Sequence, residues 1–134
     1  MILRGLAADG QGKAASFTQL AWVVSQLAER LGITPHPGTF NLRLVASDQM
    51  ARWQELKAFA GVPLDEPAST NCAAVCYPVV VNDQVPGAIV IPSVPAYPPD
   101  QVEVVAGESV RAALGIATGD AVTLRVLDQD VDDW

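Results

Sequence analysis

The chain has 134 residues, with 15 acidic and 8 basic side chains that give a net charge of -7. Half of the residues are hydrophobic, which is enough for the core of one ordinary domain and excludes an intrinsically disordered protein. The acidic balance argues against a nucleic-acid partner, because binding phosphates needs a net basic face. No apolar run reaches the roughly 20 residues of a bilayer span, and the first residues lack a signal-peptide layout. The sequence therefore predicts a cytoplasmic protein without membrane contact.

Two cysteines, Cys72 and Cys76, are the candidates for a disulfide or a metal site. On one extended strand they would lie roughly 13 Å apart, beyond the ~7 Å at which a disulfide can form. A zinc site would need two further ligands, and His36 is the only histidine in the chain. The sequence favours reduced, buried thiols, which are typical of the cytoplasm.

The first predicted elements are a short apolar strand over residues 2–7 and a helix over residues 17–31. A capping box at Ser16 is expected to begin the helix, and Gly32 to end it. Apolar residues recur at helical spacing and predict one buried face. This face would consist of Phe17, Leu20, Ala21, Val24, Leu27, Ala28 and Leu31.

The next segments are a strand and a second helix. Strict alternation over residues 40–44 predicts a strand with Phe40, Leu42 and Leu44 in the core. The second helix is expected over residues 47–60, with Phe59 on its buried side.

The rest of the chain is predicted to be mostly β, with segments rich in valine and isoleucine. Strands are expected over residues 72–81, 87–91, 102–106 and 121–127, and a short helix over 109–114. The predicted fold is mainly β with α insertions: a single-domain barrel of about six strands with two or three helices. Residues 1–127 would form this domain, and residues 128–134 an acidic C-terminal tail.

A glycine-containing turn lies between the first predicted strand and the first helix. Gly10 and Gly12 would let the backbone approach a ligand, its N–H groups can bind phosphate oxygens, and the helix N-terminus adds positive potential. The segment Gly10-Gln11-Gly12-Lys13 matches neither a Walker A loop nor a complete G-x-G-x-x-G motif. An ordinary tight turn explains it equally well.

Polar residues on two predicted strands are the other candidates for chemistry. Thr39 and Asn41 project to the same side of a strand, and their neutral oxygens could complete the shell of a Mg²⁺ that a nucleotide already carries. The alternative is a strand start whose polar residues face water. Glu103 lies among valines and needs either solvent or a partner such as a substrate hydroxyl. Arg111, at the start of the short helix, is the last candidate, and an ordinary surface arginine is the simpler interpretation of it.

The order and spacing of these motifs resemble the CTP-dependent riboflavin kinases, a family known mainly from archaea that has a cradle-loop barrel fold. The resemblance runs from about residue 5 to residue 126. It comprises the glycine-rich loop, the helix, L-G-x-x-P-x-P-G-T-x-N-x-x-L, G-A-I-V-x-P, V-E-V-V-A and L-G-x-x-x-G-D. It implies a cradle-loop β-barrel and Mg²⁺-dependent phosphoryl transfer from CTP to riboflavin, giving FMN and CDP.

The resemblance also implies roles for individual residues. Thr39 and Asn41 match the family's Mg²⁺ ligands. Glu103 matches a flavin-contacting glutamate and is the first catalytic candidate; Lys13, which would offset phosphate charge, is the second. Pro95 matches a flavin-binding position. The implied nucleotide contacts are Gln11, Gly12, Lys13, Ala14, Ala15 and Ser16 in the loop, with Glu108, Ser109, Val110 and Arg111 near the last helix.

Five positions depart from the family pattern. Ala14 replaces a loop glycine, Lys13 an acidic residue, Ser16 an aromatic residue, Pro95 the flavin-binding threonine and Gly107 a proline. They leave open a kinase of another small alcohol on the same nucleotide site, and a non-catalytic module that binds flavin or nucleotide. A third alternative, a DNA-binding relative, is disfavoured by the net charge. The sequence predicts no particular oligomeric state.

Overall fold

The structure is a computed structural model that describes residues 1–10, 18–67, 72–93 and 98–127. Seven strands and three helices are assigned within these ranges. In chain order they are β1 (Ile2–Ala8), α2 (Ala21–Leu31), β2 (Phe40–Arg43), α3 (Ser47–Lys57), β3 (Val62–Asp65), β4 (Cys72–Val81), β5 (Val85–Pro92), β6 (Gln101–Ala106), α4 (Val110–Leu114) and β7 (Ala121–Val126).

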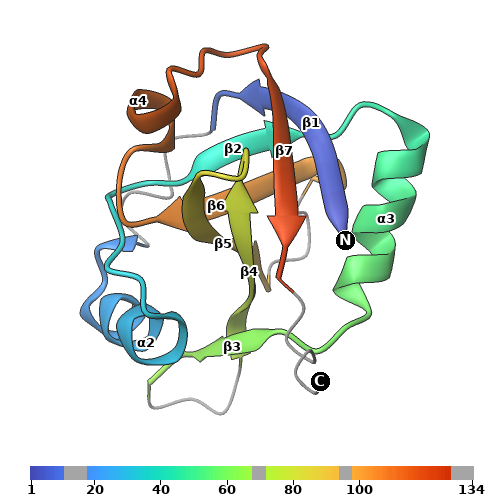
Figure 1. The fold of residues 1–134 in the computed structure, drawn as a ribbon. Helices are drawn as coiled ribbons and strands as arrows, with labels where there is room; N and C mark the ends of the chain where they lie inside the picture. Colours follow the sequence, from blue (N-terminus) through green and yellow to red (C-terminus); the bar gives the residue numbers. More distant parts are fainter. Residues whose placement is uncertain (11–17, 68–71, 94–97, 128–134) are drawn as a thin grey trace.

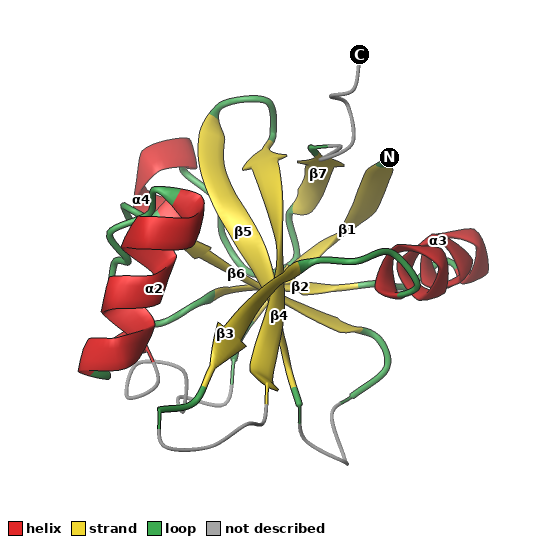
Figure 2. Cartoon of the chain, turned by 90° about the horizontal axis from the view of Figure 1, so that it is seen from below, coloured by secondary structure: helices red, strands yellow, loops and turns green. Residues whose placement is uncertain are grey.

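The strands form one antiparallel sheet that closes into a barrel. Their order is β3-β4-β5-β6-β2-β1-β7. A further pairing of β4 with β7 closes all strands except β3 into a six-stranded barrel. Strand β3 stays outside the closure and pairs with the first half of β4. Helices α2 and α3 lie on opposite sides of the barrel (Figures 1 and 2). The predicted mainly-β barrel with helical insertions is confirmed.

The buried apolar side chains form two clusters, and side-chain alternation divides β4, β5 and β6 between them. Phe40 and Leu42 of β2 and Val104 of β6 point into the barrel and belong to its main core. The opposite face of the sheet forms a second cluster where α2 covers it. The buried members of that cluster are Val23, Leu27, Leu64, Ala74, Cys76, Ala88, Val90 and Val105.

Helix α2 begins later than expected and buries a different face. Leu20 is its N-cap without a side-chain cap bond, and the expected capping residue Ser16 lies outside the described residues. Gly32 ends the helix in the left-handed region at φ 67°, as predicted. The buried residues are Val23 and Leu27, whereas Leu20, Ala21 and Ala28 of the predicted face are exposed.

The face that α2 buries is rotated because its polar residues bind β3. Gln26 Nε2 donates to the Asp65 carbonyl at 2.8 Å, and Asp65 N donates back to Gln26 Oε1 at 2.8 Å. Arg30 Nη1 donates to the Pro63 carbonyl and contacts Asp65 Oδ2 at 3.0 Å. These hydrogen bonds between α2 side chains and β3 therefore set the orientation of the helix. The spacing of apolar residues in the sequence could not predict them.

Other differences are local. Strand β3 was not predicted, and helix α3 ends at Lys57, so that Phe59 is 59% exposed instead of buried. Cys76 is buried, and the side chain of Cys72 lies outside the described part of the structure. The predicted tail at 128–134 lies outside the described residues. Within the described part of the chain, no helix combines the length and the apolar character needed to cross a membrane.

Candidate functional site

The pairing of β2 with β6 places the candidate polar residues on the outer face of the barrel. Asn41 pairs with Glu103 on one side and with Ala8 of β1 on the other. Phe40 and Leu42 point into the core, so Asn41 and Glu103 face outward by alternation. The sheet therefore brings together residues that are far apart in the sequence.

Hydrogen bonds join these residues into a polar cluster of Thr39, Asn41, Gln101 and Glu103. Thr39 Oγ1 donates to Glu103 Oε1 at 3.1 Å, and Asn41 Nδ2 donates to the Thr39 carbonyl at 3.2 Å. Gln101 Nε2 donates to Asn41 Oδ1 at 3.3 Å. Asn41 is only 7% exposed, so its amide depends on these partners. Thr39, Asn41 and Glu103 thus lie together, although they come from separate motifs of the sequence.

Both described ends of the glycine-containing loop lie against the start of β2. At one end, a Cβ on Gly10 would lie 2.4 Å from Asn41 Nδ2, so the backbone approaches the amide as only glycine allows. At the other end, the buried hydroxyl of Thr18 accepts a hydrogen bond from Gly38 N at 2.9 Å. The loop residues 11–16, with Lys13 and Ala14, lie outside the described residues. Their predicted nucleotide contacts stay predictions.

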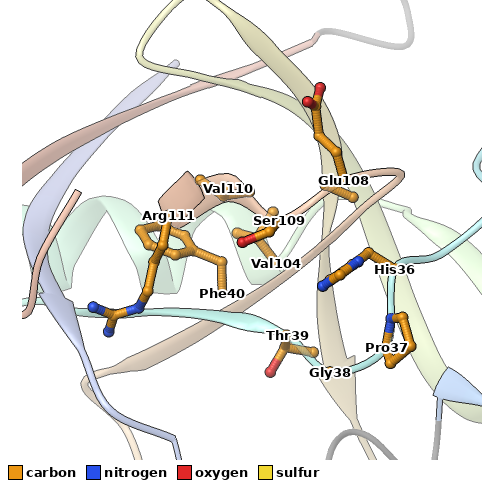
Figure 3. Close-up of a pocket in the computed structure, with 11 residues that line it drawn as sticks. His36, Pro37, Gly38, Thr39, Phe40, Val104, Glu108, Ser109, Val110 and Arg111 are labelled. Carbon is orange, nitrogen blue, oxygen red and sulfur yellow. The ribbon is translucent and has the colours of Figure 1, made fainter. Parts of the chain in front are cut away.

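A cavity of about 140 Å³ lies beside the polar cluster (Figure 3). One wall is the segment 36–40, which contributes Thr39, and the other is the segment 108–111. The predicted nucleotide segment and one predicted Mg²⁺ ligand therefore border the same space. Figure 3 also shows the Glu108 carboxylate pointing away from Thr39. The lining residues are His36, Pro37, Gly38, Thr39, Phe40, Val104, Ala106, Glu108, Ser109, Val110 and Arg111.

Arg111 places a positive charge at the beginning of the glycine-containing loop. Its Nη2 donates to the Ala8 carbonyl at 3.0 Å and lies 3.5 Å from Asp9 Oδ1. Thr118 Oγ1 donates to the same Asp9 oxygen at 2.8 Å. The Arg111 side chain is 36% exposed, so the guanidinium remains accessible to a ligand.

A second cavity of about 320 Å³ borders the cluster at Asn41. Its polar lining includes Arg43, Asp100 and Gln101, and it also contains Asp9. Sequence reasoning named none of these four as site residues, and it did not assign His36 to the first cavity. Alternation along β2 could have identified Arg43, because it shares a face with Asn41. Pro95, the predicted flavin position, lies outside the described residues.

The donor set of the cluster fits a hard divalent cation. Mg²⁺ prefers oxygen ligands and commonly takes one or two from the protein while keeping waters and ligand phosphates. Thr39 Oγ1 gives its proton to Glu103, which leaves its lone pairs available. Asn41 Oδ1 accepts one hydrogen bond from Gln101 and has a second lone pair. Because Gly10 has no Cβ, the backbone of the loop lies close to the Asn41 amide. Backbone N–H groups there could bind ligand phosphates.

Comparison with known proteins supports the family indicated by the motifs. The model of the CTP-dependent riboflavin kinase family, described as "Domain of unknown function DUF120", matches residues 7–126. A riboflavin kinase of Methanoregula boonei is 34% identical over 127 residues, which cover 92% of this chain and 56% of that protein. A riboflavin kinase of Halobacterium salinarum is 35% identical over 133 residues, covering 94% and 57%. These two relatives are about twice as long as the matched region, so this chain spans about half of their length.

A shorter relative matches along almost its whole length. A riboflavin kinase of Aeropyrum pernix is 32% identical over 129 residues, which cover 95% of this chain and 96% of that protein. The barrel described above therefore corresponds to nearly all of one relative and to a part of the others.

Proposed function

The chain belongs to the CTP-dependent riboflavin kinase family, and from this premise we propose that it transfers a phosphoryl group from CTP to riboflavin. The products would be FMN and CDP. The observation that carries the proposal is the hydrogen-bonded group of Thr39, Asn41 and Glu103 at the wall of a cavity. We expect the protein to act on these small molecules in the cytoplasm, without a nucleic-acid or membrane partner.

In this proposal the nucleotide occupies the 140 Å³ cavity between residues 36–40 and 108–111. Backbone amides of the loop 11–16 would bind its phosphates, and Arg111 and Lys13 would offset the phosphate charge. Arg111 supports this assignment because its guanidinium already lies at the loop's first residues. Little covalent chemistry is required of the protein, since phosphoryl transfer depends mainly on positioning and charge neutralisation.

Thr39 and Asn41 are the residues that would hold Mg²⁺. The bound ion would supply positive charge that neutralises the phosphate oxygens during transfer. Asn41 lies in β2, which pairs with β6 and β1, and Thr39 directly precedes this strand and is bonded to Glu103 of β6. A rigid strand suits this role because productive geometry tolerates only small displacements.

Glu103 is the candidate for orienting the acceptor hydroxyl. In the reaction, the hydroxyl oxygen bonds to the γ-phosphorus, and the bond from that phosphorus to the β–γ bridging oxygen breaks, releasing CDP. The hydroxyl proton would pass to the Glu103 carboxylate. One oxygen of this carboxylate accepts the Thr39 hydroxyl, which fixes its orientation and connects the acceptor side of the site to the metal side.

The experiment is an FMN assay with purified protein, riboflavin, Mg²⁺ and either CTP or ATP. We expect FMN with CTP, and no FMN when EDTA removes the metal. Glu103→Gln can still accept the Thr39 hydroxyl but is a poor proton acceptor, and should reduce the rate by about 10²- to 10⁴-fold. Glu55→Gln, an exposed change on α3 across the barrel, is the matched control and should leave the rate unchanged.

Two other results would redirect the proposal. FMN from neither nucleotide contradicts riboflavin kinase activity, and CTP consumption with another small alcohol would then identify a kinase of different specificity. Ala14 and Pro95 are the sequence features that favour such a change. Calorimetry that detects FMN binding but no CTP binding would instead identify a non-catalytic module.

A further inference from the structure

Strand β6 contributes two side chains to β2 through the same diagonal contact. Asn41 pairs with Glu103, and Arg43 pairs with Gln101. Each of the two β6 side chains bonds the residue that lies two positions before its own pairing partner, which is Thr39 directly before β2 in one case and Asn41 within β2 in the other. Glu103 thus accepts from Thr39, and Gln101 donates to Asn41. Long side chains can span such diagonal neighbours in an antiparallel sheet. Both proposed metal ligands are therefore held from β6.

The contacts with the Thr39 carbonyl and with Gln101 together determine which atom of the Asn41 amide faces which neighbour. Asn41 Nδ2 donates to the Thr39 carbonyl, and Asn41 Oδ1 accepts from Gln101 Nε2. In the reversed amide, the oxygen would face the Thr39 carbonyl oxygen, and the NH₂ group would face the Gln101 NH₂ group. The contact with the Thr39 carbonyl would then be repulsive because two acceptors would meet, and the contact with Gln101 would be repulsive unless the Gln101 amide reversed as well. Asn41 is only 7% exposed, so water cannot readily replace the lost partners.

We propose that Gln101 is a positioning residue that fixes the Asn41 amide with its oxygen toward the cation. The inference rests on the proposed function, because it assumes that Asn41 Oδ1 binds the metal. Gln101 would hold one lone pair of this oxygen and leave the other for the ion. Partners of this kind commonly change metal affinity by 10- to 100-fold when they are removed.

The backbone pairing of β6 does not depend on the Gln101 side chain. Gln101 is half-buried at the first position of the strand, and its backbone pairs with Arg43 whatever side chain it carries. Gln101→Met has nearly the same length and removes both hydrogen-bonding groups of the amide. The variant should therefore fold, and it should change the Asn41 amide specifically.

The first readout is the side-chain amide of Asn41 in ¹⁵N NMR without metal or nucleotide. The chain has three asparagines, and Asn41→Asp identifies the resonance by its loss. In the wild type we expect a well-ordered amide that exchanges slowly with solvent. In Gln101→Met and in the isosteric Gln101→Glu, which lacks the donor, we expect faster exchange and lower order. Gln54→Met on an exposed position of α3 is the control.

The second readout is CDP affinity, measured by calorimetry with Mn²⁺ and again with EDTA. The metal gain is the ratio of the two affinities. We expect Gln101→Met to lose roughly 10- to 100-fold of this gain, with the EDTA value and the Gln54→Met values unchanged. An unchanged metal gain, or a reduced gain with an unchanged Asn41 amide, overturns the positioning role. A wild-type protein with no metal gain contradicts the proposed metal site itself, and the role of Gln101 fails with it.

Discussion

Gly10 is the described residue of the loop that lies closest to the polar cluster. A Cβ at this position would meet Asn41 Nδ2 at 2.4 Å and Asn41 Cγ at 3.1 Å. The amide has little freedom to move, because it is buried and bonded to Thr39 and Gln101. Gly10→Ala should therefore displace either the start of the loop or the amide. We expect a loss of stability of about 1–3 kcal/mol and weaker Mg²⁺-dependent binding of CTP, measured by urea unfolding and calorimetry.

Gly107→Ala is the matched control for Gly10→Ala. A Cβ on Gly107 would have the Thr34 carbonyl oxygen at 3.5 Å, an ordinary contact, and its backbone has no positive φ. This variant should have the same free energy of unfolding and the same CTP affinity as the wild type. Wild-type affinity and stability in Gly10→Ala would show that the loop does not depend on its approach to Asn41.

Of the four residues in the polar cluster, the sequence indicated Thr39, Asn41 and Glu103 as candidates and missed Gln101. Alternation in the strand placed Thr39 and Asn41 on the side opposite Phe40 and Leu42, and the structure has this arrangement. Gln101 was missed because its partner Asn41 lies 60 positions away in the chain. A hydrogen bond between distant strands depends on register, which a single polar residue at the start of a strand does not reveal.

At the scale of elements, Tyr77 connects β4 to the segment that follows α3. Its hydroxyl donates to the Phe59 carbonyl at 2.7 Å, and burial raises the pKa of this hydroxyl above its ordinary value. The folded protein therefore binds the phenolic proton more tightly than the unfolded chain does. The resulting stability is fully present below the ordinary tyrosine pKa of about 10, and is lost as the pH rises from there through the raised pKa.

Urea unfolding of the wild type and Tyr77→Phe over pH 8–11 would measure this contribution. At pH 8 the variant should be less stable by about 1 kcal/mol, because the Phe59 carbonyl loses its donor. Above about pH 10 the difference should shrink as the wild type loses its advantage. The other tyrosine, Tyr97, is present in both proteins and cancels. A difference that stays constant across this range would contradict the raised pKa.

Predictions of elements succeeded where local pattern decides and failed where a tertiary contact decides. Valine-rich segments predicted β4, β5, β6 and β7 to within about two residues, because β propensity and turn residues are local signals. Helix α2 was expected to bury the face with Leu20 and Ala28, but it is oriented by Gln26, which pairs with the backbone of β3. Strand β3 is four residues long and contains Pro63, which is typical of an edge strand and gives little sequence signal.

At the scale of the whole molecule, the order of the strands determines the site. Strand β2 pairs with β1 on one side and with β6 on the other, and the pairing of β4 with β7 closes six strands into a barrel. Composition and strand number predicted a barrel, but they did not specify this strand order, because closure joins segments more than 40 residues apart. The central position of β2 places Thr39 and Asn41 between the loop that follows β1 and the side chains of β6.

The protein's net charge of -7 adds a requirement at this scale. A nucleotide phosphate approaching an acidic molecule needs local positive charge. Among the described residues, Arg111 supplies it at the start of the loop, and the bound cation would supply more. We therefore expect bound metal to raise the affinity for the nucleotide, and bound nucleotide to raise the affinity for the metal.

The decisive measurement for the proposed site is a crystal structure with CDP and Mg²⁺ bound. We expect the ion at about 2.0–2.1 Å from both Thr39 Oγ1 and Asn41 Oδ1, with CDP phosphate oxygens and waters completing an octahedral shell. The cytidine would lie between residues 36–40 and 108–111. A Mg²⁺ bound away from Thr39 and Asn41, or CDP bound outside the cavity that Thr39 lines, would contradict the proposed site.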